Sequence, residues 1–220
     1  MLVQGTTVIR FSGPGCILSN LNFHDIVLRG SNVDLPGPDD RVFLSSEHAY
    51  HWTKLHFLGL HNEAEDFWDD FRSVNRPADA FNLMRAGRFY YDQALASSWD
   101  AAKDDLARRL GDWRDLHATQ VLEDLVMRKA RTNFKLHQFL GQNSDKWFVE
   151  ATPHKIWGYG SPDMPKADDD FLKAMKGENR MGKIHDRCSF RISEGFAHRW
   201  EFLNYSTFLA TPTFVVNYST

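Results

Sequence analysis

The chain has 220 residues, of which 42% are hydrophobic and 25% are charged. These values are ordinary for a globular protein, so they exclude wholesale disorder and fit one domain, with or without an extension. The formal net charge of −3 argues against a protein that grips long nucleic acid mainly by electrostatics. It leaves open a protein that handles a single nucleotide or an exposed end.

Two cysteines, Cys16 and Cys188, lie far apart in the sequence and form no CxxC pair, which fits a reducing compartment. The first residues show no signal peptide, and no run reaches the roughly 18 apolar residues that a spanning helix needs. We therefore expect an intracellular protein, in the cytoplasm or the nucleus, without a membrane partner.

The elements follow from periodicity and from helix-start and turn signals. We expect strands at 6–11, 23–28, 42–44 and 146–150, with Ile156–Trp157 as a candidate for another, and a surface loop at 31–41. We expect helices at 47–58 (capped by Ser45 or Ser46), 62–74, 77–87, 99–110, 116–140, 170–176 and from 183. The pattern predicts an α+β, mainly helical single domain with a small sheet over 8–192. The aromatic-rich extension at 193–220 is expected to pack on that domain or on a partner.

The sharpest motif is the helix that begins near Ser46. At about 100° per residue, Glu47, Tyr50, His51 and Lys54 fall on one helical face. Glu47 lies in the first turn, where the helix dipole favours an ionised carboxylate. A desolvated Lys54 with a lowered pKa could form a Schiff base with a carbonyl group. On spacing alone, a solvated polar face is the more common explanation.

Three other patterns are weaker. His48 and His51 lack the HExxH order and an obvious third ligand, so we expect no metal site. The segment 177–182 could cradle an anion through its N–H groups, although a plain helix-start turn is more common. Trp157 beside Gly158 suits a ligand wall, although a buried Trp before a tight turn is more common.

Taken in order, five stretches resemble the NADAR (YbiA-like) family over roughly residues 8–192. They are Leu18-Ser19-Asn20, Ser46-Glu47-His48 with Lys54, Val126-Met127-Arg128-Lys129-Ala130, Trp157-Gly158-Tyr159-Gly160, and Gly177-Glu178-Asn179-Arg180-Met181-Gly182. The resemblance implies a mainly helical α+β fold and an N-glycosidase that removes ADP-ribose from guanine or cleaves ribosyl-amine intermediates of riboflavin synthesis. It implies no cofactor and no metal.

The resemblance also implies roles for single residues. Glu47 would stabilise positive charge at the ribose C1′, and Lys54 would capture the opened ribose as a Schiff base. Asn20 would hold sugar hydroxyls, and backbone N–H groups near Gly182 would meet phosphate. The catalytic pair is then Glu47 and Lys54, and the substrate-binding residues are Ser19, Asn20, His48, His154, Trp157, Gly158, Asn179, Met181 and Gly182.

The chain departs from the family pattern twice. Many relatives carry an Asp three residues before the Trp-Gly pair, where this chain has His154 in a stretch that is one residue short. A histidine could still relay a proton near neutral pH. Relatives often carry a Trp at the position of Thr119, whereas here Trp113 lies six residues upstream. Both changes bear on the substrate more than on the reaction.

Three hypotheses that involve a ligand remain open at this point, beside a structural or interaction protein without a ligand. The first is a hydrolase of ADP-ribosylated guanine in DNA, RNA or free nucleotide, with phosphates guided by a basic patch, unless that patch is only a solvated helix face. The second keeps the reaction but takes a ribosyl-amine metabolite. The third is a catalytically silent module that binds ADP-ribose, which the missing Asp supports. The oligomeric state is left open. The residues of the basic patch are Arg128, Lys129, Arg131 and Lys135.

Overall fold

Helices make up most of the chain in the computed structural model, which describes residues 7–28, 41–71 and 79–195. The strands are β1 (Val8–Phe11), β2 (Ile26–Leu28), β3 (Arg41–Phe43) and β4 (Trp147–Glu150). The helices are α1 (Ser46–Phe57), α2 (His61–Phe71), α3 (Asp79–Ser97), α4 (Asp100–Asp112), the π-helical turn η2 (Trp113–His117), α5 (Ala118–Thr132), α6 (Phe134–Gln142), α7 (Asp168–Lys173) and α8 (Arg180–Ser193). The predicted α+β, mainly helical fold is confirmed.

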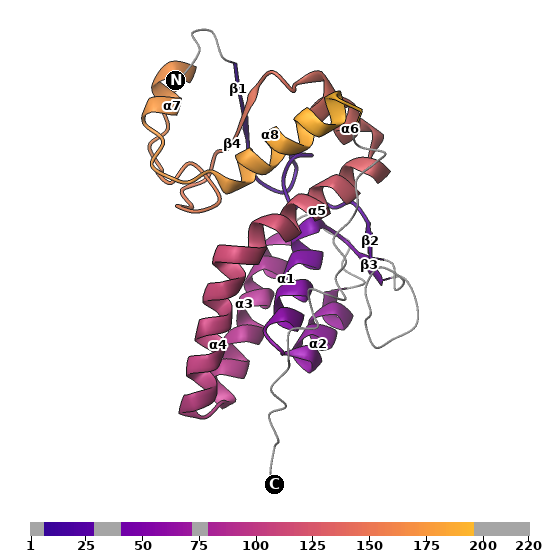
Figure 1. Ribbon diagram of the computed structural model, residues 1–220, viewed down its shortest axis with the longest axis vertical. Coiled ribbons are helices and arrows are strands. Elements are labelled where there is room, and N and C mark those ends of the chain that lie inside the picture. Colours follow the sequence, from indigo (N-terminus) through magenta and orange to yellow (C-terminus); the bar gives the residue numbers. More distant parts are fainter. Residues whose placement is uncertain (1–6, 29–40, 72–78, 196–220) are drawn as a thin grey trace.

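Helix α5 lies between two groups of elements. Figure 1 shows α1 to α4 on one side of it and β1, β4, α6 and α8 on the other. It contacts α1, α6, α8 and β2. Its buried apolar side chains come from nearly every side of the helix, as is typical of a helix enclosed by its neighbours. They are Ala118, Val121, Leu122, Leu125, Val126, Met127 and Ala130.

Two small sheets replace the single small sheet that we expected. β1 pairs with β4 in parallel, and β2 pairs with β3 antiparallel. The second edge of β4 bonds to side chains of α8 and of the residue before it. Asp186 accepts from the Phe148 N–H at 2.9 Å, and the Asn179 amide donates to the Phe148 carbonyl and accepts from the Glu150 N–H. This edge is covered, so β4 and the start of α8 are held in fixed register.

Several predicted boundaries are wrong. Helix α3 continues through Gly87 to Ser97, because packing on α1 outweighs the weak helix propensity of glycine. The single helix expected at 116–140 is η2, α5 and α6, since Asn133 is extended and its side chain caps α6 at the Leu136 N–H.

Other predicted elements differ at their ends or lie outside the description. Helix α8 begins at Arg180 rather than near residue 183, and residues 156–157 form a turn rather than a strand. The loop expected at 31–41, apart from Arg41, and the extension from residue 196 onward lie outside the described residues. The expected helix ends at 72–74 and 77–78 lie outside them too.

Candidate active site

Helix α1 begins where the sequence predicts. Ser45 is extended, and its hydroxyl accepts from the His48 N–H at 3.2 Å, which caps the helix. Glu47 lies in the first turn, and its own N–H donates to the Asn20 carbonyl at 3.1 Å. The cap and this bond fix the start of the helix against the loop that carries Asn20.

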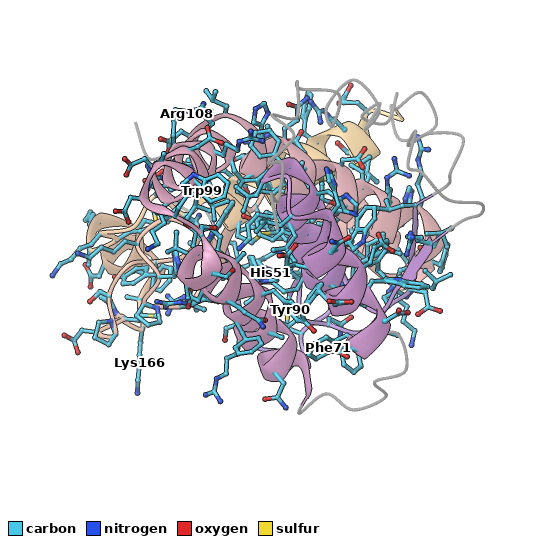
Figure 2. All side chains as sticks on the ribbon, turned by 90° about the horizontal axis from the view of Figure 1, so that it is seen from below. His51, Phe71, Tyr90, Trp99, Arg108 and Lys166 are labelled. Atoms are coloured by element: carbon cyan, nitrogen blue, oxygen red, sulfur yellow. The ribbon has the colours of Figure 1, made fainter. Side chains whose placement is uncertain are left out.

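Glu47 and His51 meet on one face of α1. His51 Nε2 lies 3.0 Å from Glu47 Oε1, and the two side chains are 8% and 17% exposed. Burial is the largest effect on the pKa of His51 and lowers it, so the ring donates from Nε2 as a neutral imidazole. In Figure 2, His51 lies in the interior, whereas Arg108 and Lys166 lie at the outside. Glu47 is therefore a partly accessible carboxylate with a fixed orientation.

Lys54 lies one turn further along the same face. Burial lowers its pKa, against the opposing charges of Glu47 and Asp92. In the part of the chain that the structure describes, its amine makes no hydrogen bond and no ion pair. An amine in this state is neutral more often than an exposed lysine, which makes it a better nucleophile.

Aromatic rings flank this face. The Tyr50 hydroxyl accepts from Trp113 Nε1 at 2.9 Å, and burial raises the pKa of the phenol, so it stays protonated. The Tyr50 ring meets the half-buried Trp157 ring edge to face, with centroids 6.2 Å apart. Trp157 therefore stands close to the Glu47 face and can offer its open side to a flat ligand.

The loop before β2 joins α1 to α8. Asn20 donates from Nδ2 to the sulfur of Met181 at 3.2 Å, across 161 residues of sequence. Ser19 is buried, and its hydroxyl accepts from the Leu21 N–H, so it shapes the turn rather than facing a substrate. Lys129 of α5 donates to the carbonyls of Ile17 and Ser19, at 2.9 and 3.0 Å. The loop is thus held from two sides.

The turn before α8 uses its N–H groups internally. Those from Lys176 to Met181 donate to carbonyls of residues 155–159, at 2.7 to 3.2 Å. The expected phosphate cradle is therefore wrong for these donors, which bind one turn to the other. The Asn179 amide is likewise engaged with β4. A Cβ at Gly158 or Gly182 would lie 2.2 Å from Thr152 Oγ1 or 2.0 Å from the Phe148 carbonyl, so both glycines permit close packing of the chain on itself.

His48 lies in the core, and its predicted contact with the substrate is wrong. Its residue exposure is 0%, and its ring packs edge to face against Phe43 and Phe67. Nδ1 accepts from the Leu44 N–H, and burial lowers the pKa of the ring to about 3. It turns inward because residues 47 and 48 are about 100° apart on the helix.

His154 caps the turn that carries Trp157. Its Nδ1 accepts from the N–H groups of Ile156 and Trp157, at 3.2 and 3.1 Å. An aspartate side chain can make the same bonds in a turn, so a histidine can replace an aspartate as the cap of this turn. The exposed ring donates nothing through Nδ1, so in the neutral tautomer its proton lies on Nε2.

The comparison with known families fits this geometry. The NADAR domain family matches residues 11–191. The chain belongs to the NADAR family. No curated protein matches it, and neither does any solved structure. The NADAR family is associated with N-glycosidase activity, and the residues that carry the family motifs meet around α1.

The basic patch expected on the NADAR motif of α5 does not form. Arg128 is buried and bonds to Asp124 at 2.6 Å, and Lys129 is buried against the loop carbonyls. Arg131 and Lys135 remain exposed. The two buried side chains stabilise the fold instead of meeting phosphates.

Glu150 is a further candidate for this site that sequence reasoning missed. It is the last residue of β4, and burial together with the charge of Glu47 raises its pKa to about 7. The signal in the sequence is a carboxyl group at a strand end, a few residues before the Trp-Gly turn. Local periodicity does not reveal that this strand end faces α1.

The described residues hold no group of three or more His, Cys, Asp or Glu side chains that could bind a metal ion. Among the helices of this described part, none is long and apolar enough to cross a membrane.

Proposed function

We propose that this NADAR protein is a hydrolase that cleaves the N-glycosidic bond between ADP-ribose and guanine, and so reverses ADP-ribosylation of DNA, RNA or a free nucleotide. One observation carries the proposal: Glu47 and the half-buried Lys54, whose amine has no hydrogen-bond partner among the described residues, share one face of α1. A protein that only binds ADP-ribose has no need for such a pair.

In the first step the C1′–N bond breaks and its electron pair leaves with the base. Positive charge then develops on C1′ and the ring oxygen of the ribose. Glu47 stabilises this charge as a carboxylate, and His51 keeps the carboxylate oriented through its 3.0 Å hydrogen bond. Because His51 is neutral, it does not cancel the negative charge that the step needs.

In the second step the neutral amine of Lys54 adds to C1′. The glycosyl-amine loses a proton, the ribose ring opens, and a Schiff base forms between Lys54 and C1′. Water then hydrolyses the Schiff base and releases ADP-ribose together with the free amine. The lowered pKa of Lys54 raises the fraction of amine that can attack at neutral pH.

The test is a hydrolysis assay on an oligonucleotide that carries ADP-ribose on guanine. Wild type should release ADP-ribose, whereas Glu47→Ala and Lys54→Ala should not, and Lys103→Ala on exposed α4 should behave as wild type. Borohydride added during turnover should leave a covalent adduct on wild type and none on Lys54→Ala. No release by wild type at high enzyme concentration would remove the proposal.

A second substrate class has an observation in its favour. Since Arg128 and Lys129 are buried, little of the expected basic patch remains to guide a polymer. A ribosyl-amine metabolite of the riboflavin pathway therefore belongs in the same assay, beside the ADP-ribosylated nucleotide.

The non-catalytic module is tested by binding. A Glu47→Ala variant that loses turnover yet still binds ADP-ribose indicates an enzyme. A wild-type protein that binds ADP-ribose, but cleaves neither the ADP-ribosylated oligonucleotide, nor the ADP-ribosylated nucleotide, nor the ribosyl-amine, indicates a binding module.

A further inference from the structure

The backbone of Glu150 is fixed on both sides. Its N–H donates to Asn179 Oδ1 at 3.1 Å, and its carbonyl accepts from the N–H groups of Thr152 and Tyr159, at 2.8 and 2.9 Å. These bonds hold the end of β4 against the Trp157 turn and against Asn179, the residue before α8. These bonds fix the direction of the Cα–Cβ bond of Glu150.

The carboxyl group of Glu150 is half-buried, and it lies near enough to Glu47 for that charge to act on it. Across the described residues it makes no hydrogen bond and no ion pair, and the charge that acts on it is that of Glu47. A carboxyl group placed in this way, beside a like charge and away from cations, favours its protonated form. Glu150 therefore holds a proton at higher pH than an ordinary glutamate does.

The neighbouring charges of β1 and the turn are directed elsewhere. Arg10 of β1 donates to the carbonyls of Pro165 and Lys166. In the Trp157 turn, His154 and Lys155 are exposed, and His154 caps that turn.

The charges of α8 are also engaged. Arg180 bonds to Glu178, and Lys183 acts on Asp186, which accepts from the Phe148 N–H. None of these cations neutralises Glu150, so its protonation depends on burial and on Glu47.

We propose that Glu150 is the general acid of the reaction and gives its proton to the nitrogen of the leaving base. This inference rests on the proposed N-glycosidase function. As the C1′–N bond breaks, its electron pair moves to nitrogen, which takes the Glu150 proton, and Glu150 becomes a carboxylate. The water that later hydrolyses the Schiff base returns a proton to Glu150, which restores the starting state.

The pairing divides the work between two carboxyl groups. Glu47 stabilises the developing positive charge, whereas Glu150, whose pKa is raised, supplies the proton for the leaving group. Environments that push two such groups apart in pKa are how enzymes assign acid and base roles. Burial and the charge of Glu47 raise the pKa of Glu150 to about 7, which is where a general acid works best at neutral pH. Asn179 is then a positioning residue for Glu150 rather than a ligand of the sugar.

The experiment compares Glu150→Gln with Glu194→Gln, which removes an exposed carboxyl group at the far end of α8. Glu150→Gln should lower kcat/KM on ADP-ribosylated guanine by about 100- to 10,000-fold. Its affinity for ADP-ribose should stay within about 3-fold of wild type. The fall in wild-type activity above about pH 7 should disappear in Glu150→Gln and persist in Glu194→Gln.

A titration separates this inference from the proposed function. Carboxyl-carbon NMR should show Glu150 titrating near pH 7 in wild type and lower in Glu47→Gln. If wild type cleaves no N-glycoside, the proposed function fails while the titration can still show the carboxyl pair. If wild type is active and Glu150→Gln keeps its rate and its alkaline limb, or if Glu150 titrates at its ordinary value, the inference is overturned.

Discussion

Two lysines lie on neighbouring helices, the half-buried Lys54 of α1 and the buried Lys129 of α5, and loss of contact with water lowers the pKa of each. Their partners differ. The ammonium of Lys129 donates to the carbonyls of Ile17 and Ser19, at 2.9 and 3.0 Å. In the described part of the chain, the amine of Lys54 donates to nothing, and only the charges of Glu47 and Asp92 act on it.

The difference shows how to distinguish a lysine that stabilises the fold from a lysine that is available for a reaction. A buried ammonium with two carbonyl partners has a role in the fold, because it satisfies groups that would otherwise lack a hydrogen bond. A buried ammonium without partners costs stability, and such groups gather at functional sites. Lys129 thus has a structural role, whereas a chemical role is proposed for Lys54.

Replacing Lys54 should have the largest effect, and on activity alone. Lys54→Met removes the nucleophile, so turnover should fall by at least about 1,000-fold. The free energy of unfolding should stay unchanged or rise, because the variant no longer desolvates an amine that has no hydrogen-bond partner among the described residues. Hydrolysis assays and urea denaturation on the same preparation check both. If Lys54→Met also lowered the free energy of unfolding, Lys54 would have a structural role like that of Lys129.

Replacing Lys129 should affect stability first. Lys129→Met leaves two loop carbonyls without their donor, so the free energy of unfolding should fall by about 3 kcal/mol. The pKa of Lys129 is lowered from 10.5 to about 8 in the folded protein, so the unfolded chain binds more protons between these values. The stability of wild type relative to the variant should therefore rise from pH 8 to about 10.5. Denaturation curves across this range measure it, and a flat difference would contradict the burial of this charge.

The packing at Gly87 tests how the Glu47 face of α1 is held in place. A Cβ at this position of α3 would lie 2.3 Å from the His51 ring, so Gly87→Ala should cost about 1–3 kcal/mol and weaken the His51 bond to Glu47. Gly111→Ala on α4 is the matched control, because a Cβ there meets nothing within 4 Å. The control should gain up to about 1 kcal/mol from helix propensity. Equal effects at the two glycines would contradict the close approach of α3 to α1.

The smallest effect is expected at the turn that faces α1. His154→Ala removes the acceptor for the N–H groups of Ile156 and Trp157, at a cost of about 1 kcal/mol. His154→Asn should restore most of the loss, because an amide oxygen can accept the same bonds. Thermal unfolding of the three proteins tests this. If the Asn variant were as unstable as the Ala variant, the histidine ring would have another role.

Local signals in the sequence predicted much of α1. The serine before the helix, the acidic first turn and the spacing of Glu47, His51 and Lys54 are short-range features, and the structure has them as expected. The five family stretches identified the family in the same way, since each is a run of adjacent residues. The helix boundaries near Gly87 and Asn133 were not predicted. At Gly87, packing outweighs the low helix propensity of glycine, and Asn133 caps the next helix.

The sequence by itself determined which groups share the Glu47 face, because helical periodicity depends only on neighbours along the chain. The tertiary structure alone decided that His48 lies in the core, that Lys129 anchors a loop and that Glu150 approaches Glu47. These outcomes depend on burial and, for Lys129, on partners more than a hundred residues away in the 17–19 loop. Protonation and hydrogen bonding are set by the surroundings in space, and only the folded chain supplies those surroundings.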